Sequence, residues 1–315
     1  MATVAGRNYF DPETLDKIAR LDLRARLVVE GFITGLHKSP YHGFAVEFAT
    51  HREYCPGDEI KHIDWKVWSK TDRLYIKEYE EETNLRCTIV LDTSKSMAYD
   101  GKDAAGYGRT GMSKFDYAAT AAACLAHLLQ HQQDAVGLVT FDNKIVHNLP
   151  ASTHPSHRKL LVHTLQQTVP SEASDVGDVF RDLAQQISRR GMVVILSDLF
   201  VDLPTLRESL RQLRHRKHDV IVLQIMHKHE LTFPFEDNTL FRGMEVLREL
   251  HTEPRALRKA YLEVVDRFLA EVRRVCASNG IDHVLVSTKD SLSVVLSSYL
   301  AARQKTRRSS GAKRK

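Results

Sequence analysis

The stretch "CTIVLDTSKSM", from residue 87 to residue 97, decides how the chain is interpreted. Its first five residues suit a buried strand, and the next positions alternate oxygen-bearing side chains: Asp92, Ser94 and Ser96. Alternate side chains in a turn that leaves a strand can converge on one point. A carboxylate and two hydroxyls are hard oxygen donors, which suit Mg²⁺ or Ca²⁺. The stretch therefore predicts a buried strand that ends at a metal site.

Apolar runs alternate with helical patterns along most of the chain. Strands are expected at 88–91, 135–141, 192–196, 220–225 and 283–286, and helical periodicity falls at 116–132, 157–168, 179–190 and 203–216. This alternation predicts an α/β fold with a mostly parallel sheet covered by helices on both faces. The run at 135–141 and the following "KIVHNLP" are also compatible with an antiparallel hairpin at the sheet edge.

A second acid follows a second expected strand. Asp198 comes after the run 192–196 as Asp92 comes after its own strand, and ligands of such sheets collect at the carboxyl ends of the strands. Ser174, ahead of a predicted helix, offers one more hydroxyl. A plainer interpretation stays open, in which Ser94 and Ser96 cap the next helix and the two acids bond only to backbone.

This pattern resembles a von Willebrand factor A-type domain, whose metal-ion-dependent adhesion site has D-x-S-x-S, then a Thr, then an Asp. The resemblance covers roughly residues 86–303. It implies a Rossmann-type sheet and a bound Mg²⁺, or another divalent ion such as Mn²⁺ or Ca²⁺, held weakly or absent at rest. A partner's carboxylate would complete the coordination. The implied ligand set is Asp92, Ser94, Ser96, Asp198 and Ser174, which stands where the family has Thr.

The segment "REYCPGDEIKHIDW" carries a second, more specific resemblance. It is similar to the bacterial domain of unknown function 58, whose pattern R-x-Y-x-x-G-D-x-x-x-x-I-D-W is matched throughout. That family implies a von Willebrand A-type domain behind a small β-containing element, and a MoxR-type AAA+ ATPase as partner in assembling or remodelling protein complexes. The matching residues are Arg52, Tyr54, Gly57, Asp58, Ile63, Asp64 and Trp65.

The signature residues are interpreted as structural. Arg52, Asp58 and Asp64 suit a network of charge-assisted hydrogen bonds, and Trp65 suits an apolar contact that fixes the small element to the large domain. An enzymatic carboxylate pair in this segment is the alternative.

The chain divides into three expected parts: an N-terminal helix and β element at 1–85, the large domain at 86–303 with an insertion near 228–254, and a basic tail at 304–315. The net charge of +5 comes from the last thirteen residues, which hold seven Lys or Arg and no acid. The remainder has 38 basic against 40 acidic residues. The tail is therefore predicted to be disordered, and a specific nucleic-acid-binding face is not expected.

Sequence motifs limit the function classes further. The chain has no P-loop, no G-x-G-x-x-G and no G-x-S-x-G, so nucleotide hydrolysis, dinucleotide binding and α/β-hydrolase chemistry have no support. Its apolar runs are too short to span a bilayer, its N-terminal segment lacks a signal-peptide core, and its cysteines lie far apart, so a cytoplasmic location is expected.

The expected function is a non-enzymatic, metal-dependent protein-binding adaptor. Two rivals stay open: a metal-dependent hydrolase that uses Asp92 and Asp198, and a membrane or nucleic-acid tether that acts through the basic tail.

Overall fold

The protein is represented by a computed structural model that describes residues 20–38, 50–53, 68, 74–78, 85–101, 111–171, 176–187, 190–245 and 249–312. The chain forms two compact units. The large unit comprises Met1–Phe32 and Leu85–Lys315, and the small unit comprises Ile33–Asn84. Each unit is described by itself.

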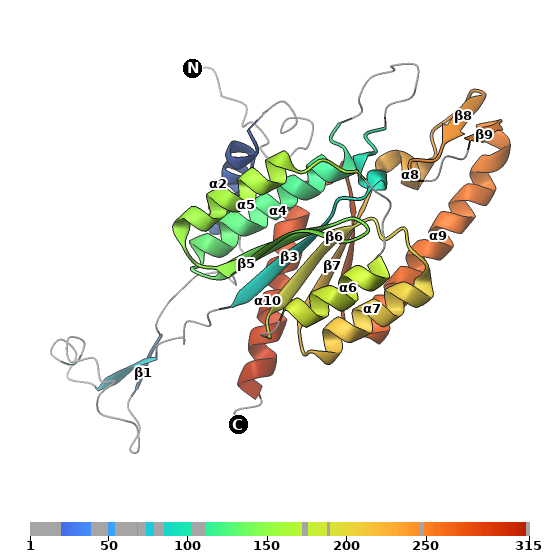
Figure 1. Cartoon of the computed structure of the whole chain (residues 1–315). Helices are drawn as coiled ribbons and strands as arrows, with labels where there is room; N and C mark the ends of the chain where they lie inside the picture. Colours follow the sequence, from blue (N-terminus) through green and yellow to red (C-terminus); the bar gives the residue numbers. More distant parts are fainter. Residues whose placement is uncertain are drawn as a thin grey trace, which may run out of the picture. The chain divides into compact units, whose positions relative to one another are not determined.

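A six-stranded sheet forms the centre of the large unit, in the order β10-β7-β6-β3-β4-β5 (Figure 1). All neighbouring strands pair in parallel except β5, which runs antiparallel to β4 at the edge. The predicted α/β class is therefore confirmed, and the hairpin interpretation of the fourth strand is the correct one. The strands are β3 (Arg86–Asp92), β4 (Ala135–Phe141), β5 (Ile145–Ser152), β6 (Met192–Ser197), β7 (Asp219–Met226) and β10 (Asp282–Ser287).

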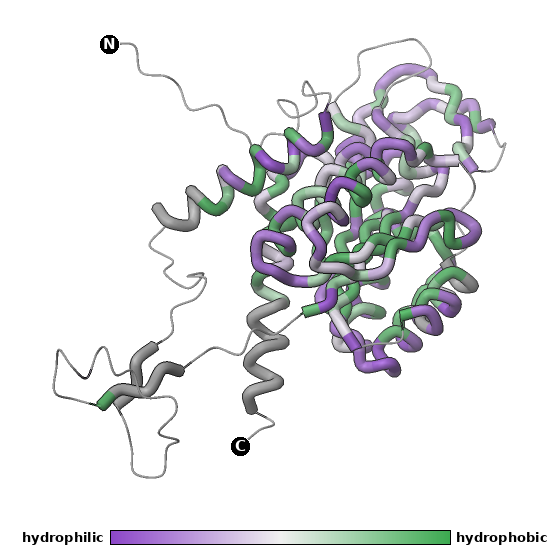
Figure 2. Tube along the Cα trace, turned by 60° about the vertical axis from the view of Figure 1, so that its left-hand side comes forward, coloured by the Kyte–Doolittle hydropathy of each residue, from purple (hydrophilic) through white to green (hydrophobic). Residues whose placement is uncertain are grey.

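Helices cover both faces of this sheet, as Figure 1 shows. One face carries α4 (Lys114–His131), α5 (Pro155–Gln167) and α10 (Ser293–Ala312), and the other carries α6 (Val176–Gln186), α7 (Leu203–His215) and α9 (Pro254–Ser278). Strands β4 and β6 are buried along their whole length, because each is enclosed by strands on both sides and by helices. Hydrophobic residues gather in the interior of the large unit and hydrophilic ones on its outer turns (Figure 2).

The helix α2 (Leu21–Lys38) joins the large unit through its first part. Its residues Leu21, Ala25 and Val28 are buried, and the thiol of Cys124 on α4 donates to the carbonyl oxygen of Ala25 at 3.9 Å. The expected N-terminal element 1–85 is thus divided, since its helix packs with the large domain as far as Phe32. The apolar face of α2 is buried in the large unit, although the segment that follows it in sequence belongs to the small unit.

The small unit contains the antiparallel strands β1 (Thr50–Glu53) and β2 (Tyr75–Glu78). Arg52 of the signature lies in β1, opposite Ile76. The other signature residues lie outside the described residues, and their structural role stays a prediction: Tyr54, Gly57, Asp58, Ile63, Asp64 and Trp65.

The segment expected as an insertion has its own local structure. It contains the short helix α8 (Lys228–Thr232) and a separate two-stranded sheet, β8 (Thr239–Arg242) with β9 (Glu249–Thr252). The ring of Phe233 lies 5.5 Å from that of Phe241 and 4.4 Å from that of Tyr261 on α9, centroid to centroid. This aromatic cluster holds the insertion on the first turns of α9.

The C-terminal segment corrects one prediction. Helix α10 continues to Ala312, where a disordered tail was expected from residue 304. Composition showed that the tail has little to bury, but Arg, Lys, Gln and Ala are good helix formers and can extend a helix that buried residues such as Val295 and Tyr299 have already nucleated. Across the described residues, no helix is both long and apolar enough to cross a membrane.

Gly137 in β4 gives a test of the edge hairpin. It lies at an irregularity of the β4–β5 register, and a Cβ atom built there would be 2.8 Å from both the nitrogen of Ala151 and the oxygen of Leu149. Because these are backbone atoms that cannot rotate away, Gly137→Ala should lower the free energy of unfolding by about 1–3 kcal/mol, and Gly137→Val by more. Urea denaturation measures the free energy of unfolding of both variants. The control is Val146→Ala at an exposed position of β5, which should change that free energy by less than about 0.5 kcal/mol. Equal midpoints for Gly137→Ala and wild type would contradict the close approach.

Candidate functional site

The loop after β3 folds back over the end of its own strand. Asp92, the last residue of β3, is 1% exposed, and its Oδ1 accepts the backbone N–H of Ser94 at 2.8 Å. Its Oδ2 accepts the hydroxyl of Ser197, at the end of β6, at 2.5 Å. The loop then makes one turn of 3₁₀-helix, η2 (Lys95–Ala98). Asp92 thus joins the carboxyl ends of two neighbouring strands.

A chain of hydrogen bonds connects the two serines of this loop to the second acid. Ser94 Oγ and Ser96 Oγ lie 3.1 Å apart, and Ser96 donates its hydroxyl to Asp198 Oδ2 at 2.8 Å. Asp198 directly follows β6 and is buried, and its Oδ1 accepts the backbone N–H of Phe200 at 3.2 Å. The structure therefore brings together four of the five residues that the sequence selected.

The capping alternative is wrong for the serines. Ser94 occupies the N-cap position of η2, but its side chain makes no capping hydrogen bond, and the cap of α4 is Ser113. The alternative is half right for the acids: Asp92 and Asp198 each accept one backbone N–H, and each gives its other oxygen to side chains.

The fifth predicted residue, Ser174, lies in the interval 172–175, outside the described residues. Ser171, just before it, donates its backbone N–H to the carbonyl oxygen of Thr93 at 3.2 Å. The described chain thus reaches the site loop three residues ahead of Ser174, whose place among the ligands stays a prediction.

A buried lysine lies beside the second acid. Lys114, the first residue of α4, is 0% exposed, and its ammonium group donates to Asp198 Oδ2 at 2.8 Å and to Glu230 Oε1 at 2.7 Å. The ammonium also lies 4.7 Å from the ring centroid of Phe200, within the range of a cation–π contact. Burial alone would lower the pKa of Lys114, but the charges of Asp198 and Glu230 outweigh it and raise that pKa well above its ordinary range. The group is therefore a permanent cation.

Glu230 is fixed by the short helix of the insertion. Its Oε2 accepts the backbone N–H of His227, while His227 Nδ1 accepts the N–H of His229 at 3.2 Å, so the pair forms a capping box at the start of α8. Burial raises the pKa of Glu230 even though Lys114 acts in the opposite direction, so the ion pair offsets only part of the cost of burying this carboxylate.

The carboxyl groups of Asp92 and Asp198 are buried close together at the ends of β3 and β6. Burial, and then the charge of Asp198, raise the pKa of Asp92 to about 7, although the hydrogen bonds from Ser197 and Ser94 oppose the shift. A cation that bound near Asp92 would relieve this charge.

The loop after Asp198 carries local strain. Leu199 has a φ of 60°, a left-handed conformation that is uncommon outside glycine, and costs roughly 1–3 kcal/mol. It is maintained because the Leu199 side chain is buried and its N–H donates to Ser197 Oγ at 2.9 Å. The next residue, Phe200, is directed outward and is 43% exposed, which gives the site an apolar rim.

The sequence missed three participants. Ser197, between the expected strand 192–196 and Asp198, is not among the residues that the sequence selects. Asp142 follows β4 as Asp92 follows β3, is buried, and accepts the N–H of Lys144 at 3.1 Å; the rule that selected the other acids would have found it. Lys114 carried no signal, because it is separated from Asp198 by 84 residues and opens a helix in a segment of ordinary composition.

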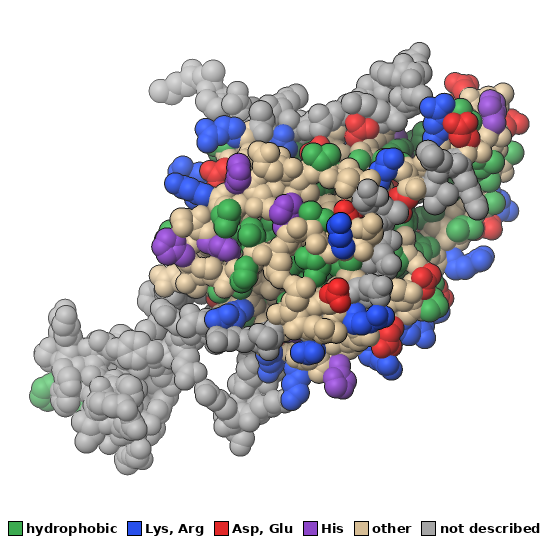
Figure 3. Space-filling model, in the orientation of Figure 1, with side chains coloured by type: hydrophobic (Ala, Val, Ile, Leu, Met, Phe, Trp, Pro, Cys, Tyr) green, Lys and Arg blue, Asp and Glu red, His purple; other side chains and the backbone are tan. Residues whose placement is uncertain are grey.

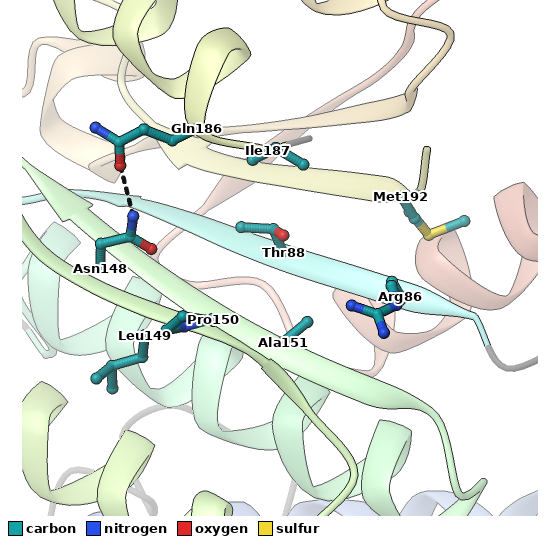
Figure 4. A pocket seen from close by; sticks show the side chains of 10 residues that line it. Arg86, Thr88, Asn148, Leu149, Pro150, Ala151, Gln186, Ile187 and Met192 are labelled. Atoms are coloured by element: carbon teal, nitrogen blue, oxygen red, sulfur yellow. Dashed lines mark hydrogen bonds between the residues drawn. The ribbon is translucent and has the colours of Figure 1, made fainter. Parts of the chain in front are cut away.

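A separate cavity of about 330 Å³ lies at the other end of the sheet (Figure 4). Its lining includes Arg86 and Met192, which are the first residues of β3 and β6. Asn148 and Gln186 also line it, and Asn148 Nδ2 donates a hydrogen bond to Gln186 Oε1 at 2.5 Å. The cavity is thus at the amino ends of the strands that carry Asp92 and Asp198 at their carboxyl ends, and it is not part of this site. On the face of the large unit seen in Figure 3, positive and negative side chains are interspersed rather than gathered by sign.

Comparison with known families identifies the chain. The family model described as "protein of unknown function DUF58" matches residues 50–268. The chain belongs to this family. Relatives of this DUF58 protein include an uncharacterized protein of Mycobacterium tuberculosis and one of Mycobacterium bovis, each 25% identical over 279 residues, which is 86% of this chain and 83% of the relative.

Solved structures resemble the DUF58 fold more loosely. An aerotolerance-related membrane protein of Bacteroides fragilis aligns with a TM-score of 0.47 and 16% identity over 70% of this chain and 99% of that one. The protein BatB of Bacteroides thetaiotaomicron gives 0.46 and 15% over 71% and 98%, and the VWA domain of SpRpn10 gives 0.36 and 11% over 67% and 93%. None of these comparisons indicates an enzymatic activity.

The donor set at the DUF58 strand ends fits a divalent ion of the magnesium type. Two ligands on adjacent octahedral positions, each about 2.1 Å from Mg²⁺, lie about 3 Å apart, and the hydroxyl oxygens of Ser94 and Ser96 are 3.1 Å apart. Within the described part of the chain, no three His, Cys, Asp or Glu side chains are grouped to hold a metal, so an ion at this site would depend on the hydroxyls.

His227 makes the start of α8 sensitive to acid. Burial, with the charges of His229 and Lys114, lowers the pKa of His227 to about 4. The unfolded ring takes up a proton near pH 6.5 and the folded ring only near pH 4, so this residue lowers the free energy of unfolding as the pH falls through that interval. His227→Asn keeps a capping acceptor but cannot titrate, and should make the pH dependence of that free energy shallower between about pH 6.5 and 4.

Urea denaturation at pH 7 and pH 5 measures this difference. The partly buried His283, whose pKa is also lowered to about 4 by burial, contributes equally to both proteins and cancels in the comparison. Parallel pH profiles for wild type and His227→Asn would contradict the assignment.

Proposed function

We propose that this DUF58 protein is a protein-binding adaptor that works through a divalent ion, Mg²⁺ by preference, at the carboxyl ends of β3 and β6. The observation that supports the proposal most directly is the hydrogen bond from Ser96 Oγ to Asp198 Oδ2 at 2.8 Å, with Ser94 Oγ 3.1 Å from Ser96 Oγ. A hydroxyl that donates its proton to a carboxylate keeps its lone pairs for a cation.

The division of labour among the ligands favours binding. Ser94 and Ser96, with Ser174 as a third predicted hydroxyl, are uncharged direct ligands, while Asp92 and Asp198 hold the loop and orient the hydroxyls. An ion held by neutral oxygens retains positive charge and offers an exchangeable position to a carboxylate from a partner. The exposed ring of Phe200 adds an apolar contact at the rim.

The hydrolase alternative receives less support. The side chains that donate to Asp92 and Asp198 include the hydroxyls of Ser94, Ser96 and Ser197 and the ammonium of Lys114. The raised pKa of Lys114 makes it unsuitable as a general base. A protein-binding role does not require a general base.

The partner in this proposal is a MoxR-type AAA+ ATPase or its client protein, in the cytoplasm. This choice comes from the family resemblance, and the chemistry of the site adds one requirement: the partner must present an Asp or Glu side chain or a C-terminal carboxylate to the ion.

Metal binding is tested first without a partner. Titration of the protein with Mg²⁺ and Mn²⁺ in a calorimeter should give a weak binding heat, because the direct ligands carry no charge. The double variant Ser94→Ala/Ser96→Ala should lose it. Asp202→Asn is the control, because Asp202 caps α7 four residues after Asp198 on the exposed surface, and Asn keeps the cap bond to Thr205. Equal heats from wild type and the double variant would exclude an ion at these serines.

Partner binding is tested next. A metal–carboxylate contact at the centre of an interface should behave as a hot spot, whose truncation costs about 2 kcal/mol and weakens binding roughly 30-fold. EDTA and Ser96→Ala should each release the ATPase or its client in a pull-down, while circular dichroism stays native and Asp202→Asn binds normally. If binding survives both treatments, the partner surface lies elsewhere on the molecule.

A further inference from the structure

Lys114 has no part in the site as proposed so far, yet its ammonium group contacts one of the two acids that support it. We propose that Lys114 is a tethered cation that competes with the divalent ion for Asp198, and so sets the metal affinity of the site and couples it to the insertion. The inference rests on the proposed function, since it concerns the same site.

The competition follows from one shared oxygen atom. Asp198 Oδ2 accepts both the hydroxyl of Ser96 at 2.8 Å and the ammonium of Lys114 at 2.8 Å. An ion that binds Ser96 Oγ therefore approaches a fixed positive charge that is held on the same carboxylate oxygen. Because the surroundings are buried, solvent screens this repulsion poorly. The ammonium of Lys114 therefore lowers the affinity of the site for the ion, and the ion weakens the contact between Lys114 and Asp198.

The charges bear on how the acids are held together. Asp198 is buried and Glu230 is largely buried, with a side chain 15% exposed, and the ammonium between them offsets part of the cost of burying both carboxylates. A site that lacked Lys114 would need an external cation to bring its acids together. Lys114 therefore makes occupancy by a divalent ion optional, which suits a site that is to be filled with a partner.

The link to the insertion follows from the second carboxylate. Besides Asp198, the ammonium contacts Glu230 Oε1 at 2.7 Å and lies 4.7 Å from the ring centroid of Phe200, so these are the groups left to hold it when an ion weakens the contact with Asp198. Glu230 is part of the capping box that starts α8, so any shift of Lys114 acts on that helix. The ion site and the segment 228–254 are thus connected through three side chains: Asp198, Lys114 and Glu230.

Two substitutions with opposite expected effects test the proposal, with the full chain and Mg²⁺ or Mn²⁺ alone as the probe. Lys114→Met keeps an unbranched side chain that is one atom shorter and removes the charge, and should tighten ion binding about tenfold, the usual effect of one neighbouring charge on an equilibrium that changes charge. Glu230→Gln keeps an oxygen for the N–H of His227 but leaves Asp198 as the carboxylate that holds Lys114, and should weaken ion binding severalfold.

Each substitution has a control that changes the same charge at an exposed position nearby. Lys95→Met removes a positive charge from the site loop itself, and Glu236→Gln removes a negative charge from the insertion, where Glu236 pairs with Arg255 on the surface. Both controls should leave ion binding close to that of wild type, since solvent screens them.

Thermal unfolding gives a second readout. In EDTA, Lys114→Met should melt below wild type, because Asp198 and Glu230 lose their shared cation, and saturating Mg²⁺ should raise its melting temperature by more than it raises that of wild type. An equal rise in both proteins would overturn the competition.

The outcomes separate the two proposals. If wild type binds the ion and Lys114→Met binds it no more tightly, the role of Lys114 is overturned and the metal site stands. If only Lys114→Met binds an ion, the competition is supported and the metal-dependent function of the natural chain fails. If no variant binds one, both fail. Should Lys114→Met not fold, Glu230→Gln decides: unchanged affinity overturns the competition.

Discussion

The burial of opposite charges at one edge of the sheet is the constraint on which the rest of this structure depends. Parallel pairing places the carboxyl ends of β3 and β6 next to each other, so the acids that follow them, Asp92 and Asp198, are buried side by side. Two like charges in such a place are costly. Hydrogen bonds donated by the hydroxyls of Ser96 and Ser197 and by the ammonium of Lys114 offset part of this cost.

This arrangement separates two tasks that metal sites often combine. In a site made of carboxylates, the ligands neutralise the ion and hold the fold together at once. Here the strand ends are held by contacts among the protein's own groups, such as the bond from Ser197 to Asp92 and the ion pairs of Lys114, and the proposed function leaves the ion to the neutral hydroxyls. In the proposed function, an ion held by neutral hydroxyls keeps positive charge for a partner's carboxylate.

The fold could be predicted from sequence because its signals are local. Five strands of the sheet and their helices follow from runs such as "MVVILS" and from helical periodicity, and Asp92 and Asp198 follow from the rule that parallel strands end together. Lys114 could not be predicted, since its role arises only when α4 packs beside β6 and the insertion returns Glu230 to it. The helical end of the chain was missed for a different reason: low apolar content limits packing but does not prevent a helix from continuing.

The same reasoning explains why the insertion follows β7 and not another strand. β7 is the neighbour of β6 on the side away from β3, so a segment that leaves its carboxyl end meets Asp198 from the flank opposite the serine loop. Gln224 of β7 already contacts this acid, donating its amide to the carbonyl oxygen of Asp198 at 3.1 Å. Asp198 is therefore approached from one flank by the hydroxyl ligands and from the other by β7 and the insertion, with Lys114 between Asp198 and Glu230. A carboxylate in that position is exposed to the charges on both flanks, and this is the basis on which the proposed ion at the serines would be coupled to the insertion through Lys114.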